Sequence, residues 1–121
     1  MSKTILTVDD SRTMRDMLKF SLSNAGYDVY QAEDGVHGLE VLRDVTPDVI
    51  ITDINMPRLD GFGFIEHVRG DGFYRAVPIL VLTTESDAAK KDRARRAGAT
   101  GWIVKPFDPA KLVEAIRRVA A

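Results

Sequence analysis

The sequence has no cysteine, no long hydrophobic run and no excess of charge of either sign. Without cysteine there is no disulfide, no thiolate metal site and no catalytic thiol. The 17 Lys and Arg residues against 18 Asp and Glu give a formal net charge of -1, so there is no basic excess to bind nucleic acid or an anionic membrane. No apolar stretch approaches the roughly twenty residues of a membrane span, and the first residues lack a signal-peptide pattern. We therefore expect a cytoplasmic protein.

The length and composition favour a single globular domain. The chain has 121 residues, of which 45% are hydrophobic and 29% charged. A chain of this size buries roughly two thirds of the surface that it exposes when unfolded, which suffices for one core. We find no internal repeat and no linker composition. We expect one domain over residues 1–121.

Short runs rich in β-branched residues alternate with longer stretches of helical periodicity along the whole chain. The runs that predict strands cover residues 4–8, 27–32, 48–52, 78–82 and 102–104. The third and fourth runs are apolar on both faces, as strands covered on both sides are. Repeated βα units form parallel sheets with right-handed crossovers. The pattern predicts an α/β fold, a (βα)5 doubly wound five-stranded parallel sheet of the flavodoxin-like kind.

Several local signals mark the predicted helices. Ser11 is a good N-cap for the first helix, whose inner stripe is predicted to contain Met14, Met17, Leu18, Ser21, Leu22 and Ala25. We interpret Asp34-Gly35 as a turn before a helix that buries Val36, Leu39 and Leu42. The later helices follow Gly61, span residues 86–97 and end the chain, with Phe62, Ile65 and Val68 facing inward in the first of these.

Polar side chains follow four of the five predicted strands. Asp9 and Asp10 follow the first strand, Asp53 the third, Thr83 the fourth and Lys105 the fifth. In such folds the carboxyl ends of the strands form the ligand site, and three carboxylates about 4 Å apart repel by roughly 4 kcal/mol per pair. A cation is therefore expected there, and an all-oxygen ligand set favours Mg²⁺. Lys105 supplies a second positive charge, and the Thr83 hydroxyl could bind a phosphoryl oxygen.

Together with its surroundings, this pattern resembles the receiver domain of two-component response regulators. The resemblance covers essentially the whole chain and rests on the motifs Val8-Asp9-Asp10-Ser11, Asp53-Ile54-Asn55-Met56-Pro57, Asp60-Gly61, Ala97-Gly98-Ala99 and Val104-Lys105-Pro106-Phe107. It implies that Asp53 accepts a phosphoryl group from a histidine kinase. It also implies that Asp10, Asp53 and the carbonyl of Asn55 bind Mg²⁺, that Asp9 supports the metal through water, and that Thr83 and Lys105 contact the phosphoryl group.

Within this family the chain is most similar to single-domain chemotaxis regulators of the CheY type, which carry no output domain. Asn55 and Glu85, two residues beyond the phosphoacceptor and the threonine, are the pair found in those regulators, where they flank the path of an attacking water. The resemblance implies a CheA-like histidine kinase and a FliM-like flagellar motor switch protein as partners, with a phosphatase as a further one. We expect a monomeric signalling protein that catalyses its own phosphorylation and dephosphorylation but is not a turnover enzyme.

Two positions depart from the family pattern. Trp102 stands where the family usually has Tyr or Phe, and its indole is larger and has no hydroxyl. Thr84 stands where many relatives have a smaller residue, and its methyl group could hinder movement of that aromatic side chain. Both positions are therefore expected to modulate the switch.

Other functions remain open from the sequence. The chain could be a phosphorelay carrier or a phosphate sink for a shared kinase. A haloacid-dehalogenase-type phosphatase is disfavoured because Asn55, not an aspartate, lies two residues beyond Asp53. A nucleotide-binding fold is disfavoured because no glycine-rich loop follows the first strand. The cluster Lys90, Lys91, Arg93, Arg95 and Arg96 fits a solvated helix face and a partner surface about equally.

Overall fold

The computed structural model describes residues 3–120. Five strands alternate with five α-helices, and one short 3-10 helix precedes the fourth strand. In chain order the elements are β1 (Thr4–Val8), α1 (Arg12–Asn24), β2 (Asp28–Ala32), α2 (Gly35–Val41), β3 (Val49–Thr52), α3 (Gly61–Gly70), η1 (Gly72–Tyr74), β4 (Ile79–Thr83), α4 (Ala88–Ala97), β5 (Gly101–Val104) and α5 (Pro109–Val119).

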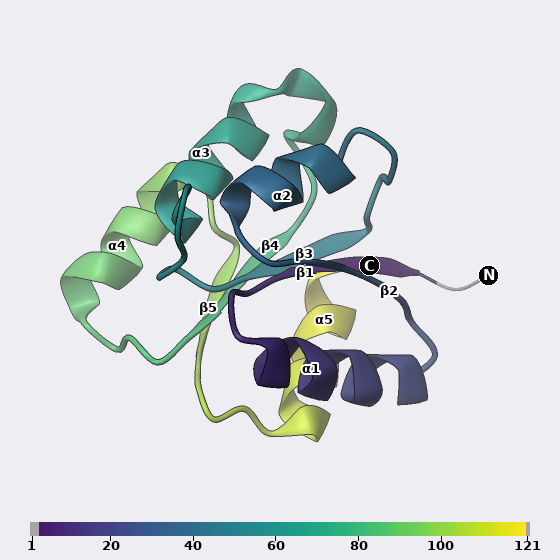
Figure 1. Ribbon diagram of the computed structural model, residues 1–121. Helices are drawn as coiled ribbons and strands as arrows, with labels where there is room; N and C mark the ends of the chain where they lie inside the picture. The colour runs from purple at the N-terminus through teal and green to yellow at the C-terminus, as the bar shows by residue number, and fades with distance from the viewer. Residues whose placement is uncertain (1–2, 121) are drawn as a thin grey trace.

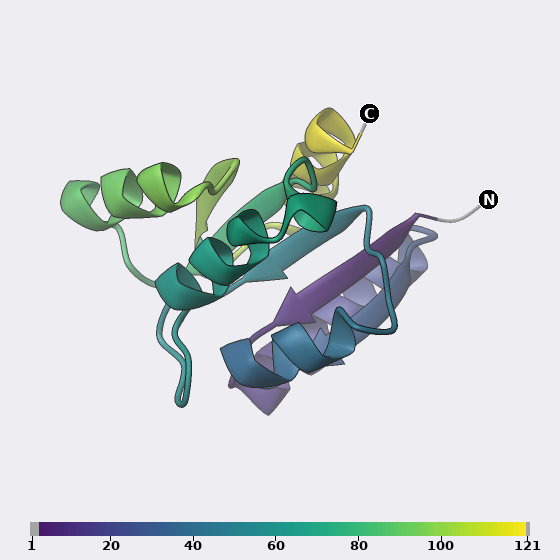
Figure 2. The same cartoon turned by 90° about the horizontal axis from the view of Figure 1, so that it is seen from above.

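The strands form one parallel sheet in the order β2-β1-β3-β4-β5. Helices α1 and α5 cover one face of the sheet, and α2, α3 and α4 lie on the other (Figures 1 and 2). Strand order reverses between β1 and β3, so the crevice at their carboxyl ends is the expected ligand position for such a fold. The predicted (βα)5 doubly wound sheet is confirmed.

Each face of the sheet has its own hydrophobic core because successive side chains of a strand point to opposite faces. Leu6 and Val8 of β1 pack with α2 and α3, whereas Ile5 packs with α1 and α5. Every residue of β3 and of β4 is buried, as the apolar runs predicted. The buried strand β3 therefore lies between β1 and β4 and brings the carboxyl ends of the three strands together.

Two sequence predictions about individual residues need correction. Asp34-Gly35 was predicted as a turn, but Asp34 is the N-cap of α2, accepting a hydrogen bond from the His37 amide, and Gly35 is the first helical residue. Met17 is 49% exposed, not part of the inner stripe of α1. Only Leu18 and Leu22 of that stripe are fully buried, because a helix on a sheet buries a narrower face than its hydrophobic residues suggest.

Element boundaries also differ slightly from those predicted. Thr83 is the last residue of β4, where the prediction ended the strand at Leu82. Helix α4 begins at Ala88 after the N-cap Asp87, two residues later than predicted, because the Asp87 carboxylate caps the Ala89 amide. No helix among residues 3–120 combines the length and the apolar character that crossing a membrane requires.

Candidate phosphoacceptor and metal site at the carboxyl edge of the sheet

Three carboxylates gather at the carboxyl ends of β1 and β3. One oxygen from each of Asp9, Asp10 and Asp53 lies within 4.8 Å of the others. The adjacent strands bring them together, because Val8 pairs with Thr52 and the Asp53 amide donates a 2.9 Å hydrogen bond to the Val8 carbonyl. Asp9 and Asp53 are buried, whereas Asp10 is exposed. The cluster is therefore closed toward the protein and open to solvent on the Asp10 side.

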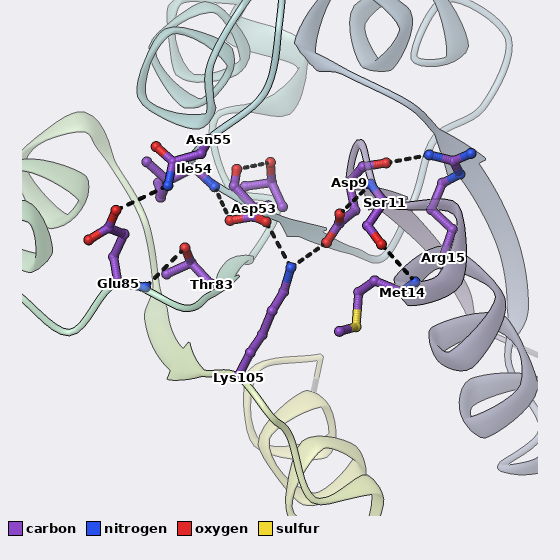
Figure 3. Close-up of polar contacts among 11 residues, drawn as sticks. Asp9, Ser11, Met14, Arg15, Asp53, Ile54, Asn55, Thr83, Glu85 and Lys105 are labelled. Carbon is purple, nitrogen blue, oxygen red and sulfur yellow. Dashed lines mark hydrogen bonds and ion pairs between the residues drawn. The ribbon is translucent and has the colours of Figure 1, made fainter.

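Lys105 reaches this cluster from the end of β5. Its Nζ donates 2.8 Å hydrogen bonds to Oδ2 of Asp9 and to Oδ2 of Asp53, as Figure 3 shows. The Lys105 side chain is only 10% exposed. Its backbone is held by a 2.8 Å hydrogen bond from its amide to the Thr83 carbonyl, and the peptide bond that follows, to Pro106, is cis. One buried ammonium thus bridges two buried carboxylates.

The electrostatics of this cluster leave excess negative charge. Burial raises the pKa of Asp9 above its usual value, although hydrogen bonds from Lys105 and the Ser11 amide act in the opposite direction. Burial also tends to lower the pKa of Lys105, but its hydrogen bonds to Asp53 and Asp9 outweigh that effect and raise it. Lys105 therefore stays charged, and a single positive charge faces three carboxylates. A divalent cation would complete the compensation.

The donor set suits a hard divalent cation. The clustered ligand atoms are all carboxylate oxygens. Oxygen-only coordination with an open, solvent-facing side is the arrangement in which Mg²⁺ binds one or two carboxylates, keeps several waters and accepts a phosphate oxygen. The residues present therefore fit Mg²⁺.

Asp53 is oriented by contacts to both of its carboxylate oxygens. Oδ1 accepts a 2.6 Å hydrogen bond from the Ile54 amide, and Oδ2 accepts the one from Lys105. The Thr52 hydroxyl donates to the Asp53 carbonyl at 2.8 Å. The side chain is 11% exposed, so a small reagent can approach it from the solvent side. The Asp53 carboxylate is thus fixed in orientation and partly accessible to solvent.

Thr83 lies at the end of β4, next to the strand that carries Asp53. It is fully buried, and its hydroxyl accepts a 3.3 Å hydrogen bond from the Glu85 amide. That bond leaves the hydroxyl proton free to rotate toward another acceptor. Thr84, by contrast, is exposed. Thr83, the threonine predicted to contact a phosphoryl group, therefore lies beside the strand that ends just before Asp53, whereas Thr84 faces solvent.

Glu85 joins three segments around the site. Its Oε1 accepts a 3.1 Å hydrogen bond from Asn55 Nδ2 and forms a 3.1 Å ion pair with Lys90 of α4. Its backbone carbonyl accepts a 3.0 Å hydrogen bond from Nε1 of Trp102 on β5. The hydrogen bond from Asn55 and the contact with Lys90 lower the pKa of Glu85. The predicted pair of Asn55 and Glu85 is in contact, and the indole N–H of Trp102 donates to the loop between β4 and α4 that carries Glu85.

Sequence reasoning missed two polar contacts near this site. Arg15 of α1 donates a 2.7 Å hydrogen bond from Nη1 to the Asp9 carbonyl. Arg58, in the loop after β3, forms a two-point ion pair with Asp34. Spacing along the chain contained no signal for Arg15. The sequence likewise contained no signal for the contact of Arg58, because its partner Asp34 lies 24 residues away and could not be identified without the fold.

The fold and the residues at its carboxyl edge define a receiver domain of the CheY-like α/β class. The chain belongs to the response regulator receiver domain family, whose model matches residues 5–117. It is similar to CheY-type chemotaxis response regulators, as the relatives described next show. Phosphorylation-based signalling is general to this family.

The similar proteins span nearly the whole chain. Chemotaxis protein CheY1 of Helicobacter pylori is 44% identical over 118 residues, covering 95% of this chain and 94% of that protein. The structure of CheY4 of Vibrio cholerae is 44% identical, covers 98% of this chain and 99% of that one, and superimposes with a TM-score of 0.94. The receiver domain of a Pseudomonas aeruginosa sensor histidine kinase, 27% identical with a TM-score of 0.92 over 99% and 98% of the two chains, has a magnesium ion coordinated in its active site cleft.

Proposed function

We propose that this chain is a phosphorylation-activated switch that accepts a phosphoryl group on Asp53. The single observation that carries the proposal is the Lys105 ammonium bound between Asp9 and Asp53, with Asp10 completing an oxygen-lined cluster beside it. A buried lysine and three carboxylates at one strand edge are costly to assemble unless the cluster binds charged ligands. We propose one receiver domain over residues 1–121.

The metal of this site is proposed to be Mg²⁺, held by Asp10, Asp53 and the Asn55 carbonyl, with Asp9 acting through water. The ion supplies charge neutralisation for the phosphoryl oxygens when bound. The oxygen-only donor set supports this assignment, as does the magnesium ion in the similar Pseudomonas receiver.

The chemistry divides into a transfer and a hydrolysis. A carboxylate oxygen of Asp53 forms a bond to phosphorus while the N–P bond of a donor phosphohistidine breaks, and the imidazole leaves with the bonding electrons. Lys105 and Thr83 then stabilise the phosphoryl oxygens by a charge-assisted and a neutral hydrogen bond. In hydrolysis, water attacks phosphorus, inorganic phosphate leaves, and the Asp53 carboxylate is regenerated. Asn55 and Glu85 flank the path of that water.

The output is proposed to be altered protein binding. An acyl phosphate places nearly two negative charges on phosphoryl oxygens in place of the single charge of the Asp53 carboxylate, and these oxygens draw Thr83 and the loop that carries Thr84 and Glu85 toward them. Trp102 is tied to that loop through the Glu85 carbonyl, so loop movement reaches the surface formed by α4 and β5. Similarity to chemotaxis regulators supports a CheA-like kinase as donor, a FliM-like motor switch protein as target and a phosphatase as a third partner. It also supports a cytoplasmic, monomeric protein that is not a turnover enzyme.

The test is phosphotransfer followed by binding. Purified CheA-type kinase, phosphorylated with labelled ATP, is mixed with the native chain and with Asp53→Asn, and binding to a FliM-type protein is measured with and without beryllofluoride, a phosphoryl mimic. We expect label transfer to the native chain alone and tighter motor-protein binding with the mimic. Transfer without motor binding, accompanied by return of the label to a histidine phosphotransfer domain, would instead identify a phosphorelay carrier.

A further inference from the structure

The loop between β3 and α3, residues 53–60, is attached to the start of α2 by an ion pair. Arg58 Nε donates to Asp34 Oδ2 at 2.7 Å, and Arg58 Nη2 donates to Asp34 Oδ1 at 3.0 Å. The Asp34 side chain is 4% exposed, whereas that of Arg58 is 52% exposed and covers it. Two parallel hydrogen bonds from one guanidinium to one carboxylate fix orientation as well as distance. The ion pair therefore sets where the loop lies.

Arg58 adopts an unfavourable backbone conformation to make this contact. Its φ is 66°, the only positive φ of a non-glycine residue in the described part of the chain. Such a conformation is unfavourable for a residue with a Cβ, and it persists only where surrounding contacts hold it. The contact to Asp34 is that restraint.

A backbone contact beside the ion pair restricts the loop further. The Gly35 amide donates a 3.1 Å hydrogen bond to the Leu59 carbonyl, and a Cβ at Gly35 would lie 2.5 Å from that oxygen. The Gly61 amide closes the base of the loop on the Ile54 carbonyl at 2.8 Å. The loop is thus fixed at its base and near Arg58, and Asn55 lies between these points. Pro57, with its restricted φ, connects Asn55 to Arg58 and transmits the restraint.

We propose that the Arg58–Asp34 ion pair is a positioning device for the metal site, holding the loop so that the Asn55 carbonyl faces the carboxylate cluster. This inference rests on the proposed function, because it assumes a cation bound beside Asp53. Neither residue contacts the cluster itself. Groups that orient metal ligands in this way alter metal affinity by roughly 10–100-fold when removed.

The first test variant is Arg58→Gly. Glycine adopts positive φ freely, so the substitution removes the ion pair while relieving backbone strain, and the chain is expected to remain folded in EDTA. Calorimetric titration with MgCl₂ is expected to show affinity reduced by about tenfold. Arg58→Lys, which retains the charge but not the two-point geometry, is expected to restore part of that loss.

The second variant, Asp34→Asn, keeps an N-cap for α2 while removing the carboxylate charge. It is expected to weaken Mg²⁺ binding to the same extent as Arg58→Gly, and the double variant is expected to be no weaker than either single one. Arg118→Ala is the matched control, because it removes an exposed, ion-paired arginine near the end of α5, at the opposite edge of the sheet. Its Mg²⁺ affinity is expected to equal that of the native chain.

The outcomes separate this inference from the proposed function. Native-like Mg²⁺ affinity in Arg58→Gly and Asp34→Asn, with a native chain that binds Mg²⁺ and accepts phosphate, overturns the positioning role alone. Additive losses in the double variant also overturn it. A native chain that binds no Mg²⁺ overturns the proposed metal site and this inference together.

Discussion

At the residue scale, Lys105 is held in place by hydrogen bonds from both its side chain and its backbone amide. It satisfies two buried carboxylates with one ammonium, at 2.8 Å from each. A lysine in this position competes with a cation for the resting carboxylates, yet it is also placed to stabilise added phosphoryl charge. Its two roles predict opposite effects of its removal on metal binding and on phosphorylation.

Lys105→Met is expected to slow phosphorylation by a small-molecule phosphodonor about 100-fold or more, because a preorganised charge at the reacting oxygens is lost. Mg²⁺ affinity is expected to be unchanged or higher, because the carboxylates lose a competing cation. Rapid-quench mass spectrometry and calorimetry measure the two effects. Lys111→Met, an exposed lysine of α5, is the control. Phosphorylation of Lys105→Met at the native rate would contradict the assignment.

The Asp34 carboxylate predicts a pH dependence of stability. The hydrogen bonds from the Arg58 guanidinium hold its pKa below the usual value of 3.8, despite an opposing effect of burial. A carboxyl group whose folded-state pKa is depressed contributes stability that is present above its unfolded pKa and is lost as the pH falls through the folded one. Urea denaturation should therefore show the native chain more stable than Asp34→Asn at pH 7, with the gap shrinking below about pH 4. A difference in stability between the two proteins that does not change with pH would rule out a stabilising ion pair at Asp34.

At the scale of single elements, helix α2 packs on α3 through a glycine. A Cβ at Gly38 would lie 2.7 Å from Phe64 Cε1 and 3.3 Å from Val8 Cγ2, and the Phe64 ring is fully buried. The sequence analysis assigned Phe62, Ile65 and Val68 to the inner face of α3 but not Phe64, which is among the largest fully buried side chains. The reason is that α3 contacts α2 as well as the sheet, so its buried face is wider than one stripe.

This packing predicts opposite effects for two glycine substitutions in helices. Gly38→Ala is expected to lower the free energy of unfolding by about 1–2 kcal/mol, because overpacking against Phe64 exceeds the gain in helix propensity. Gly70→Ala, at the end of α3 with open space around it, is expected to be neutral or to raise it by up to about 1 kcal/mol. Denaturant titrations of both variants measure the difference. Equal changes in the free energy of unfolding would show that the close approach of Phe64 does not disfavour a larger residue at position 38.

Elements were easier to predict than their precise contacts. Buried strands such as Val49–Thr52 can be predicted from sequence because a run of apolar β-branched residues is stable only as a strand covered on both faces. Asp34 was misread as a turn residue because the same residue type favours turns and N-caps. Met17 was misplaced because hydrophobicity alone does not tell which apolar residue of a wide stripe reaches the sheet.

The residues of the candidate site could be predicted from the sequence, but some of the hydrogen bonds around it could not. Strand ends in a parallel sheet meet, so Asp9, Asp53 and Lys105 could be placed together from the sequence. The contact of Trp102 with the Glu85 carbonyl could not, because it depends on how a loop folds over β5. Whether Trp102 and Thr84 modulate the switch stays a prediction.

At the scale of the whole molecule, the site joins elements from both ends of the chain: Asp9 follows the first strand and Lys105 the last. A ligand bound there restrains β1, β3 and β5 together. Because it binds only the folded state, such a ligand stabilises the entire domain by mass action.

Mg²⁺ is accordingly expected to raise the stability of the native chain. At a free concentration about 100 times the dissociation constant, the gain is about 2.7 kcal/mol, seen as a higher melting temperature that EDTA reverses. Asp10→Asn is the informative variant, because Asp10 is exposed and contributes to the cluster without being buried in the fold. It is expected to fold normally and to lose most of the Mg²⁺-dependent gain. An equal Mg²⁺ effect in both proteins would place the ion elsewhere.

The most direct test of the account is intact-mass detection of phosphorylation by acetyl phosphate. The native chain and Asp53→Asn are incubated with the donor in Mg²⁺ and in EDTA, and their masses are compared. The account predicts a single phosphoryl adduct on the native chain in Mg²⁺, none in EDTA, and none on Asp53→Asn in either. An adduct of equal yield on Asp53→Asn, or one that forms without a divalent cation, would contradict the assignment of Asp53 as the metal-dependent phosphoacceptor.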